Sequence, residues 1–382
     1  MVSAKSSDTA SYTTSTPSPS PRPQWVKYEP DDVHHSPFVV FYEITRACDL
    51  VCQHCRACAQ PKPHPSELSF DSACGLIGQL AEFRRPPLLV FTGGDPLKRP
   101  DVYDLVRHAR QVGLTTAMTP SATPLVTDQA VHDLRKAGIS RLAVSLDGID
   151  AATHDAFRGV DGSYDHTLSI MAAARQADLP MQVNTTVTRR NVGQLDAMAQ
   201  MLADEKIVLW SVFFLVPVGR GLAEQRITPA EYEQVFERLW HHAESQPYAI
   251  KTTEAPHYRR YVLQRDGDPQ RGDVTGRAER APIGINDGKG VMFISHTGQV
   301  FPSGFMPIEA GRYPRQSVVD VYQNSEIFRK LRDPDLLGGK CGACEFRHDC
   351  GGSRARAYAL TRDPLAAEPD CAYLPQSWRI GS

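Results

Sequence analysis

From residue 37 onward the sequence alternates short apolar runs, rich in β-branched residues, with longer amphipathic stretches, and this alternation restricts the fold more than any other feature. Parallel strands need a long crossover, usually a helix, and these crossovers are right-handed. Six such strand–helix units predict an α/β fold whose parallel sheet closes incompletely, as a partial (β/α)6 barrel.

The predicted strands occupy residues 38–44, 88–92, 115–119, 142–146, 182–188 and 208–216. The predicted helices occupy residues 70–83, 102–112, 128–137, 164–177, 192–203 and 229–243. In parallel β/α folds the functional site lies at the carboxyl ends of the strands. We therefore expect the functional residues in the loops that follow the strands.

The chain divides into four predicted segments. Residues 1–36 are dominated by Ser, Thr, Pro and Asp and are predicted to be a disordered tail. The barrel spans 37–245, and a connecting segment spans 246–290, with an exposed stretch at 265–280. Residues 291–382 form a small cysteine-rich module that starts with a hairpin at 291–301 and has a helix near 318–331.

Composition limits the partners. The 42 basic and 44 acidic residues give a formal net charge of -2, which offers no electrostatic footprint for nucleic acid or an anionic membrane. The sequence has neither an apolar run of membrane-spanning length nor the start of a signal peptide. We expect a cytoplasmic protein that acts on a small molecule or a peptide.

Three cysteines follow the first predicted strand with C-x3-C-x2-C spacing: Cys48, Cys52 and Cys55. Three thiolates bound to a four-iron cluster would leave one iron free for another ligand. Two alternatives stay open at this point. Structural zinc requires four closed ligands, and Cys58 would extend the run to a ferredoxin-like set in which no iron is open.

A second group combines Cys341, Cys344 and Cys350 in C-x2-C-x5-C spacing with the distant Cys371. Four thiolates can fully ligate one [4Fe-4S] cluster or one zinc ion, and spacing does not choose between them.

The turn Thr92-Gly93-Gly94-Asp95-Pro96 ends the second predicted strand. Two glycines allow close approach of a backbone, and the carbonyls of such a turn can accept hydrogen bonds from a ligand ammonium group.

The cysteine triad, this turn and the segment Ser145-Leu146-Asp147-Gly148 resemble the radical SAM superfamily, over nearly all of residues 37–375. The resemblance implies that Cys48, Cys52 and Cys55 hold a [4Fe-4S] cluster whose open iron binds S-adenosylmethionine (SAM). Reductive cleavage of SAM in that family gives a 5′-deoxyadenosyl radical, which abstracts hydrogen from the substrate. It also implies a reducing partner such as flavodoxin or ferredoxin.

The resemblance further implies SAM-binding positions at the strand ends. Gly93, Gly94 and Asp95 would face the methionine amino group. Arg158 would pair with the carboxylate of SAM, since its planar fork binds carboxylates bidentately. The remaining positions are Ser145, Asn184 and Val216.

The C-terminal cysteines resemble the SPASM and twitch modules of radical SAM enzymes, which favours an iron–sulfur cluster over zinc. Ser303 stands where a cysteine would begin a first auxiliary site, so we expect one auxiliary [4Fe-4S] cluster.

The segment 344–358 is similar to tetrapyrrole-modifying radical SAM enzymes of haem d1 formation and the alternative haem route. Arg354 and Arg356 could bind propionates there, or neutralise a cluster or cap a helix. Glu254, His257 and Tyr258 are candidate catalytic residues, because an acid, a His and a Tyr can transfer protons or hydrogen atoms.

The sequence therefore predicts a radical SAM enzyme of oxidoreductase or lyase type that acts on a tetrapyrrole or another small molecule. The alternative is a maturase of a ribosomally made peptide. Such maturases often carry an N-terminal winged-helix domain, for which residues 1–36 are too short and too polar. A third hypothesis, of another class, is an electron-transfer or zinc protein without SAM chemistry.

Overall fold

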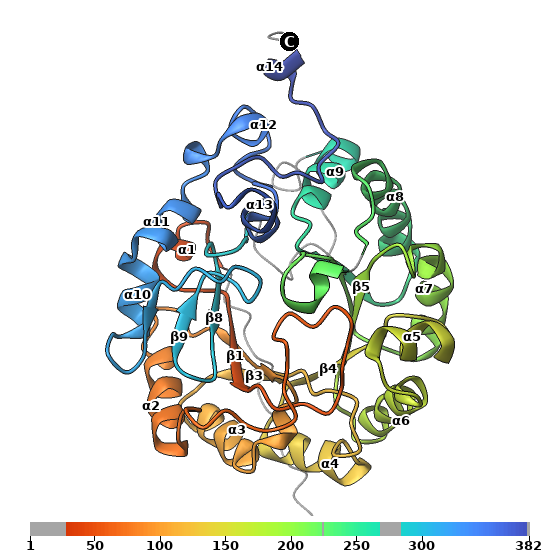
Figure 1. Ribbon diagram of the computed structural model, residues 1–382, viewed down its shortest axis with the longest axis vertical. Coiled ribbons are helices and arrows are strands. Elements are labelled where there is room, and N and C mark those ends of the chain that lie inside the picture. Colours follow the sequence, from red (N-terminus) through yellow and green to blue (C-terminus); the bar gives the residue numbers. More distant parts are fainter. Residues whose placement is uncertain (1–27, 224, 268–283, 380–382) are drawn as a thin grey trace, which may run out of the picture.

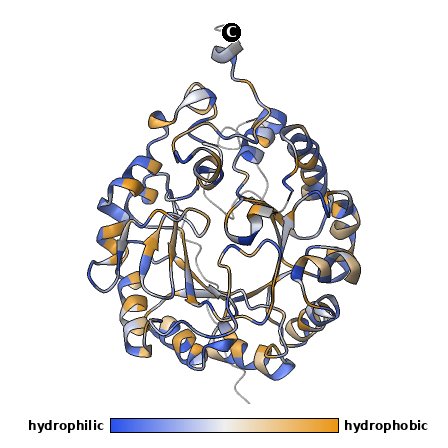
Figure 2. Cartoon of the chain, in the orientation of Figure 1, coloured by the Kyte–Doolittle hydropathy of each residue, from blue (hydrophilic) through white to orange (hydrophobic). Residues whose placement is uncertain are grey.

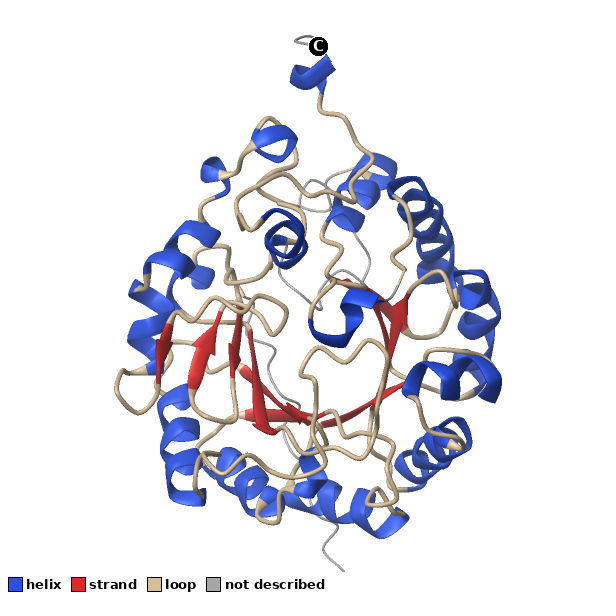
Figure 3. Ribbon diagram, in the orientation of Figure 1, coloured by secondary structure: helices blue, strands red, loops and turns tan. Residues whose placement is uncertain are grey.

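The computed structural model describes residues 28–223, 225–267 and 284–379 (Figure 1). Its described strands form one ten-stranded sheet in the order β10-β9-β8-β1-β2-β3-β4-β5-β6-β7. Figure 3 shows the strands as an arc inside a ring of helices, open on the side where the C-terminal segments lie. The predicted α/β partial barrel is confirmed, and the sheet extends beyond six strands at both edges.

The six predicted strands correspond to β1 to β6 and shift by at most a few residues. The strands of the sheet are β1 (Val39–Thr45), β2 (Leu88–Gly93), β3 (Thr115–Met118), β4 (Arg141–Ser145), β5 (Met181–Val187), β6 (Leu209–Phe214), β7 (Ala249–Thr253), β8 (Val291–Ile294), β9 (Gln299–Phe301) and β10 (Gly311–Arg312).

The predicted barrel helices correspond to α2, α3, α4, α6, α7 and α8, and α5 and α9 are additional. The helices are α1 (Asp32–His35), α2 (Phe70–Ala81), α3 (Val102–Gln111), α4 (Asp128–Ala137), α5 (Ala151–Arg158), α6 (Ser163–Gln176), α7 (Leu195–Asp204), α8 (Pro229–Ser245), α9 (His257–Asp266), α10 (Val318–Asn324), α11 (Glu326–Arg332), α12 (Gly339–Gly342), α13 (Arg354–Thr361) and α14 (Gln376–Arg379).

Helix α4 illustrates why the pattern folds locally as predicted. The Thr127 side chain accepts a hydrogen bond from the backbone N–H of Ala130, which satisfies a free donor of the first turn. Gly138 ends the helix in the left-handed conformation, with φ of 113°. Val131 and Leu134 are fully buried between the two ends, and each contributes about 2 kcal/mol of hydrophobic stabilisation. Figure 2 shows that the other helices of the ring also combine hydrophobic (orange) and hydrophilic (blue) residues.

Four strands outside the predicted barrel, β7 to β10, complete the sheet. β7 pairs in parallel with β6, so the predicted connecting segment contributes a strand. β8 pairs in parallel with β1 along Val39↔Val291, and β9 returns antiparallel to it. The predicted hairpin is confirmed, but it lies in the barrel sheet beside β1 and not apart from it.

Other predictions need correction. Residues 28–36, assigned to the disordered tail, include α1, where Asp32 is fully buried and pairs with Arg84 at 2.9 Å and Arg85 at 2.6 Å. The helix predicted near 318–331 is broken at Ser325, whose ψ of 144° is extended, and gives α10 and α11. Residues 1–27 and most of the stretch at 265–280 lie outside the described residues. No described helix has the length and apolar character needed to span a membrane.

Candidate active site

The first cysteine group lies in the loop after β1, at the carboxyl edge of the sheet, and Cys48 and Cys52 are buried. Backbone hydrogen bonds fix the loop: Cys48 N–H donates to the carbonyl of Gln60 at 2.7 Å, and Gln53 N–H donates to the carbonyl of Phe157 at 2.9 Å. The two bonds tie the cysteine loop to its own return segment and to the end of α5. The loop is therefore a fixed element of the barrel rim.

The Gly93-Gly94 turn packs directly against this loop. Gly94 N–H donates to the carbonyl of Thr45 at 2.8 Å, and Asp95 N–H donates to the carbonyl of Ala47 at 2.6 Å. A Cβ atom on Gly94 would lie 2.3 Å from the Ala47 carbonyl oxygen, which no side chain can tolerate. The glycines are thus required for contact with the cysteine loop, independently of any ligand.

Asp95 is fully buried behind the turn. Its carboxylate accepts hydrogen bonds from the hydroxyl of Thr123 at 2.6 Å and the backbone of Leu97 at 3.2 Å. Burial raises the pKa of this carboxyl group. The contacts give Asp95 a structural role in the turn, and its predicted contact with SAM stays a prediction.

Ser121 and Thr123 were missed by sequence reasoning. The Ser121 hydroxyl donates to the carbonyl of Gly94 at 2.7 Å and lies 3.3 Å from the sulfur of Cys48. Both residues follow β3, which is the signal that could have identified them, since each preceding strand end carries a predicted site residue.

Arg158, the last residue of α5, is buried next to the first cysteine group. Its guanidinium forms an ion pair with Asp147 and donates to the sulfur of Cys52 at 3.8 Å. Asp147 also accepts a hydrogen bond from the backbone of Thr186 at 2.7 Å. Arg158 therefore already has a carboxylate partner within the chain, and its expected pairing with SAM stays a prediction.

The remaining SAM-binding candidates fall into two places. Ser145 and Asn184 are directly paired across β4 and β5, so the structure brings them together. Val216 is buried elsewhere, in an apolar cluster with Met306, Leu331 and Ala355 from the C-terminal part of the chain. It thereby joins the end of the barrel to that part.

Several buried polar atoms near the cysteine loop have no hydrogen-bond partner among the described residues: Nδ1 of His54, Nε of Arg158 and Nη2 of Arg220. Arg220 also donates from Nε to the carbonyl of Cys52 at 2.8 Å. An unpaired buried donor costs about 1–3 kcal/mol, so such atoms normally face a partner. Their gathering here fits a bound polar or anionic group beside the three thiols.

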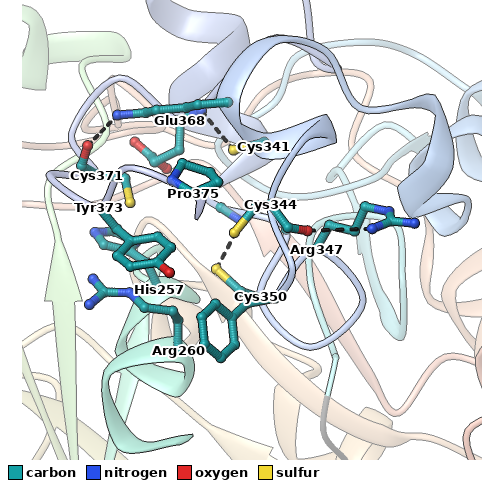
Figure 4. Close-up of a pocket in the computed structure, with 14 residues that line it drawn as sticks. His257, Arg260, Cys341, Cys344, Arg347, Cys350, Glu368, Cys371, Tyr373 and Pro375 are labelled. Carbon is teal, nitrogen blue, oxygen red and sulfur yellow. Dashed lines mark hydrogen bonds between the residues drawn. The ribbon is translucent and has the colours of Figure 1, made fainter. Parts of the chain in front are cut away.

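The second cysteine group forms a pocket between α9 and the C-terminal segments (Figure 4). All four predicted cysteines, Cys341, Cys344, Cys350 and Cys371, line it together with His257, Arg260 and Tyr373. Spacing alone predicted these four thiols as one set, and the structure places them around one space.

Hydrogen-bond donors point at the sulfurs of this pocket. Glu368 N–H donates to the sulfur of Cys341 at 3.2 Å, and Gly352 N–H donates to that of Cys350 at 3.4 Å. Burial raises the pKa of the Cys350 thiol and raises that of Cys371 to about 11. Burial thus disfavours free thiolates at Cys350 and Cys371, and a bound cation would favour them.

His257 supports the same interpretation. The residue is fully buried, and neither ring nitrogen has a hydrogen-bond partner among the described residues. Its ring packs against Phe236 at 4.9 Å and Tyr232 at 5.1 Å. Nε of Arg260, in the same pocket, is also buried without a partner. These donors fit a group with acceptor atoms, such as a cluster with its sulfides.

The nine cysteines are all free thiols. Within the described ranges, no three or more His, Cys, Asp and Glu side chains are spaced as ligands of a single metal ion. The thiolates of a four-iron cluster bind different irons, so they lie farther apart than the ligands of one metal ion.

Glu254 and Tyr258, two of the three catalytic candidates, lie in different surroundings. Glu254 adopts φ of 59° after β7, and its carboxyl group accepts a hydrogen bond from Ser353 at 2.5 Å. Desolvation, followed by the charge of Asp287, raises the pKa of Glu254 well above its usual range. Tyr258 packs against Phe236 and does not line the four-cysteine pocket.

Arg354 and Arg356 are buried and already engaged. Arg356 pairs with Glu368 at 3.2 Å and Asp370 at 3.3 Å, and Arg354 donates to the sulfur of Cys341 at 3.9 Å. Both guanidinium groups thus have partners within the chain, and propionate binding stays a prediction. Arg354 contacts a thiol of the second cysteine group, which agrees with the expected role of neutralising a cluster, and Arg356 belongs to an internal ion-pair network.

Comparison with known proteins identifies related sequences. Residues 42–202 match the model of the radical SAM superfamily. An AdoMet-dependent heme synthase of Methanosarcina barkeri is 38% identical over 89% of this chain and 98% of its own length. A pre-heme d1 synthase of Dinoroseobacter shibae is 27% identical over 87% of this chain and 85% of its own length.

Solved structures share the fold. SuiB of Streptococcus suis, determined with bound S-adenosylmethionine, superimposes with a TM-score of 0.68 at 16% identity, over 89% of this chain and 78% of its own. SuiB has also been solved with its precursor peptide SuiA, with a TM-score of 0.67.

Proposed function

Since the chain belongs to the radical SAM superfamily and is a radical SAM enzyme, we propose that it modifies a side chain of a tetrapyrrole. When bound, the family's [4Fe-4S] cluster and SAM supply a 5′-deoxyadenosyl radical that abstracts hydrogen from the substrate. We assign the cluster to Cys48, Cys52 and Cys55. The observation that carries the tetrapyrrole assignment is the similarity to heme synthases, which extends over nearly the whole chain.

The residues around the first site would orient these groups. Arg158 holds the thiol of Cys52 and is itself held by Asp147. Gly94 offers a carbonyl that the Ser121 hydroxyl also contacts, and Ser145 and Asn184 lie at adjacent strand ends. We propose that Gly93, Gly94, Asp95, Ser145, Arg158, Asn184 and Val216 form the SAM site, either by direct contact or by supporting its walls.

We assign an auxiliary [4Fe-4S] cluster to Cys341, Cys344, Cys350 and Cys371. The unpartnered donors of His257 and Arg260 and the shared pocket support it. Its role would be to accept an electron from the substrate after hydrogen removal, which makes the enzyme an oxidoreductase; loss of a fragment in the same step would make it a lyase as well.

Glu254 and His257 are proposed to act near this second site, Glu254 as a protonated acid and His257 as a hydrogen-bond donor. Tyr258 stays a prediction, although its aromatic surroundings favour a packing role. A flavodoxin or ferredoxin as reductant and a cytoplasmic location also stay predictions.

Anaerobic turnover tests the proposal. Protein reconstituted with iron and sulfide would be reduced with dithionite and given SAM, with and without an iron porphyrin that carries propionate side chains. We expect 5′-deoxyadenosine in both cases, more of it with the porphyrin, and a change in porphyrin mass. Formation of 5′-deoxyadenosine without any change in the porphyrin would overturn the tetrapyrrole assignment.

Peptide modification is the second candidate, because the fold neighbour SuiB is a peptide-bound structure. That likeness concerns the fold alone. Acceleration of SAM cleavage by a peptide and not by porphyrins, in the same assay, would favour it.

A further inference from the structure

A second hollow lies beside the first cysteine loop, distinct from the four-cysteine pocket. It has a volume of about 210 Å³ and is open at its mouth, between β1, the cysteine loop and the β8–β9 hairpin. Glu43 is near the carboxyl end of β1, the edge that carries the site in parallel β/α folds. The hollow is therefore placed where substrate would meet the first cysteine site.

One buried acid organises the polar side of the hollow. Glu43 accepts a hydrogen bond from Arg56 at 3.0 Å and contacts Nδ1 of His296 at 2.8 Å. The side chains of Glu43 and His296 are 4% and 8% exposed. Glu43 thus fixes the orientation of one arginine and one histidine.

Two side chains of the hollow, Arg46 and His296, have nitrogen atoms without a hydrogen-bond partner among the described residues. Arg46 donates from Nη2 to the carbonyls of Ala57 and Cys58, while its Nε and Nη1 make no hydrogen bond within the described residues. Nε2 of His296 likewise has no hydrogen-bond partner there; because Nδ1 donates to the Glu43 carboxylate, Nε2 is a donor only when the ring is doubly protonated. Both side chains line the hollow.

The charge balance favours an anion. Arg46 and Arg56 carry two positive charges and Glu43 carries one negative charge, so the polar side is net positive before His296 is counted. The guanidinium fork binds carboxylates bidentately. Uncompensated positive charge in a partly enclosed hollow is stabilised when a carboxylate enters.

Part of the lining is apolar. Phe293, Phe301 and Pro307 form this part, and the guanidinium of Arg56 stacks over the ring of Phe293 at 4.5 Å. Gly304 permits that stacking, because a Cβ atom there would lie 3.0 Å from the Phe293 ring and 3.2 Å from Arg56. The hollow combines a flat apolar wall with a cationic edge.

We propose that this hollow is a substrate subsite, in which Arg46 and the doubly protonated ring of His296 bind a carboxylate arm of the substrate while the apolar wall covers its flat body. The inference rests on the proposed function, which supplies a substrate of that chemistry. Glu43 and Arg56 are positioning residues: they hold His296 and the apolar wall without contacting the carboxylate.

Calorimetric titration of the reconstituted holoenzyme, under anaerobic conditions, tests the subsite with an iron porphyrin bearing propionates and with its methyl ester. We expect the acid to bind wild-type protein at least about tenfold more tightly than the ester, as one charge-assisted carboxylate contact provides. Arg46→Gln and His296→Gln should each reduce this preference several-fold, mainly by weakening the binding of the acid form of the porphyrin.

Arg46→Gln leaves the Glu43 contacts intact, so it keeps the test valid if His296→Gln unfolds. Matched controls are Arg107→Gln, on the exposed face of α3, and His132→Gln, on α4, which should keep the full preference. Equal binding of acid and ester to wild type, or an unchanged preference in Arg46→Gln, would overturn the subsite. Porphyrin turnover in that event would leave the proposed function standing, whereas no turnover by wild type overturns the function itself.

Discussion

The two cysteine sites differ in how complete they are. The first has three thiols on one loop of the barrel rim, and the unpartnered donors around it come from His54, Arg158 and Arg220. The second has four thiols from segments up to Cys371, gathered around one pocket. A site with three thiols leaves a coordination position for a reactant, while a site with four closes the cluster and leaves only electron transfer.

We infer that the first site carries the reaction and that the second site sets a redox potential. At the first site the surrounding elements fix a loop and leave space for ligands. At the second site, N–H donors to sulfur and a buried His would set the environment of the proposed cluster itself.

Removal of one thiol from the first site has the largest expected effect. Cys52→Ala should lower SAM cleavage to background and remove about half of the bound iron, since each site accounts for one four-iron cluster. Iron analysis and quantification of 5′-deoxyadenosine measure both. Cys58→Ala is the matched control and should keep its iron and activity; loss of iron in that variant would favour a closed, ferredoxin-like site.

Removal of one thiol from the second site should separate the two functions. Cys350→Ala is expected to lose about half of its iron and all substrate conversion, while SAM cleavage persists. Cys74→Ala, on α2, serves as the control with full iron. An unchanged iron content in Cys350→Ala would exclude the auxiliary cluster, and zinc in the purified wild type would then indicate that the four cysteines form a zinc site.

His257→Phe should change the potential of the second cluster without removing it. A hydrogen bond to a sulfide stabilises the reduced state, and its loss, worth about 1 kcal/mol, lowers the potential by about 40 mV. A redox titration followed by electron paramagnetic resonance measures the shift. Tyr258→Phe, outside the pocket, should leave the potential unchanged; equal potentials in all three proteins would show that His257 does not contact the cluster.

Glu254→Gln should have an effect that is visible in the pH dependence of stability. The raised pKa means that folded protein holds a proton that the unfolded chain releases above about pH 4.5. Wild-type stability therefore falls relative to Glu254→Gln as pH rises from there towards the raised pKa, by at most about 1.4 kcal/mol per pH unit. Urea unfolding midpoints measured across this range give the difference, and parallel curves would show that Glu254 is ionised in the folded state.

The barrel could be predicted because its information is local. Each strand and helix of residues 37–245 carries its own apolar period, so boundaries such as 128–137 for α4 agree with the structure. β7 was missed because Ala249–Thr253 is only partly buried and has no apolar run. The pairing of β8 with β1 could not be predicted, because nothing in either segment specifies a partner so distant in the chain.

The candidate site, like the barrel, was predictable only where its information is local in the sequence. Cysteine spacing predicted the second set, whose four thiols line one pocket, while the set on the first loop stays a prediction. Side-chain partners were not predictable. Arg158 pairs with Asp147, and Arg356 pairs with Glu368, through contacts that form only in the folded chain. The hollow beside Glu43 was also not predictable, since eight of its twelve lining residues come from the distant segment 293–307.

The pairing of Val39 with Val291 has a consequence for biosynthesis. A ribosome releases β1 and its cysteine loop long before it has made β8, so one edge of β1 waits without its neighbour while most of the chain is translated. Exposed strand edges invite aggregation, and long-range pairing forms late. We expect nascent chains that end before residue 291 to depend on chaperones, and iron loading of the first site to follow release of the finished chain.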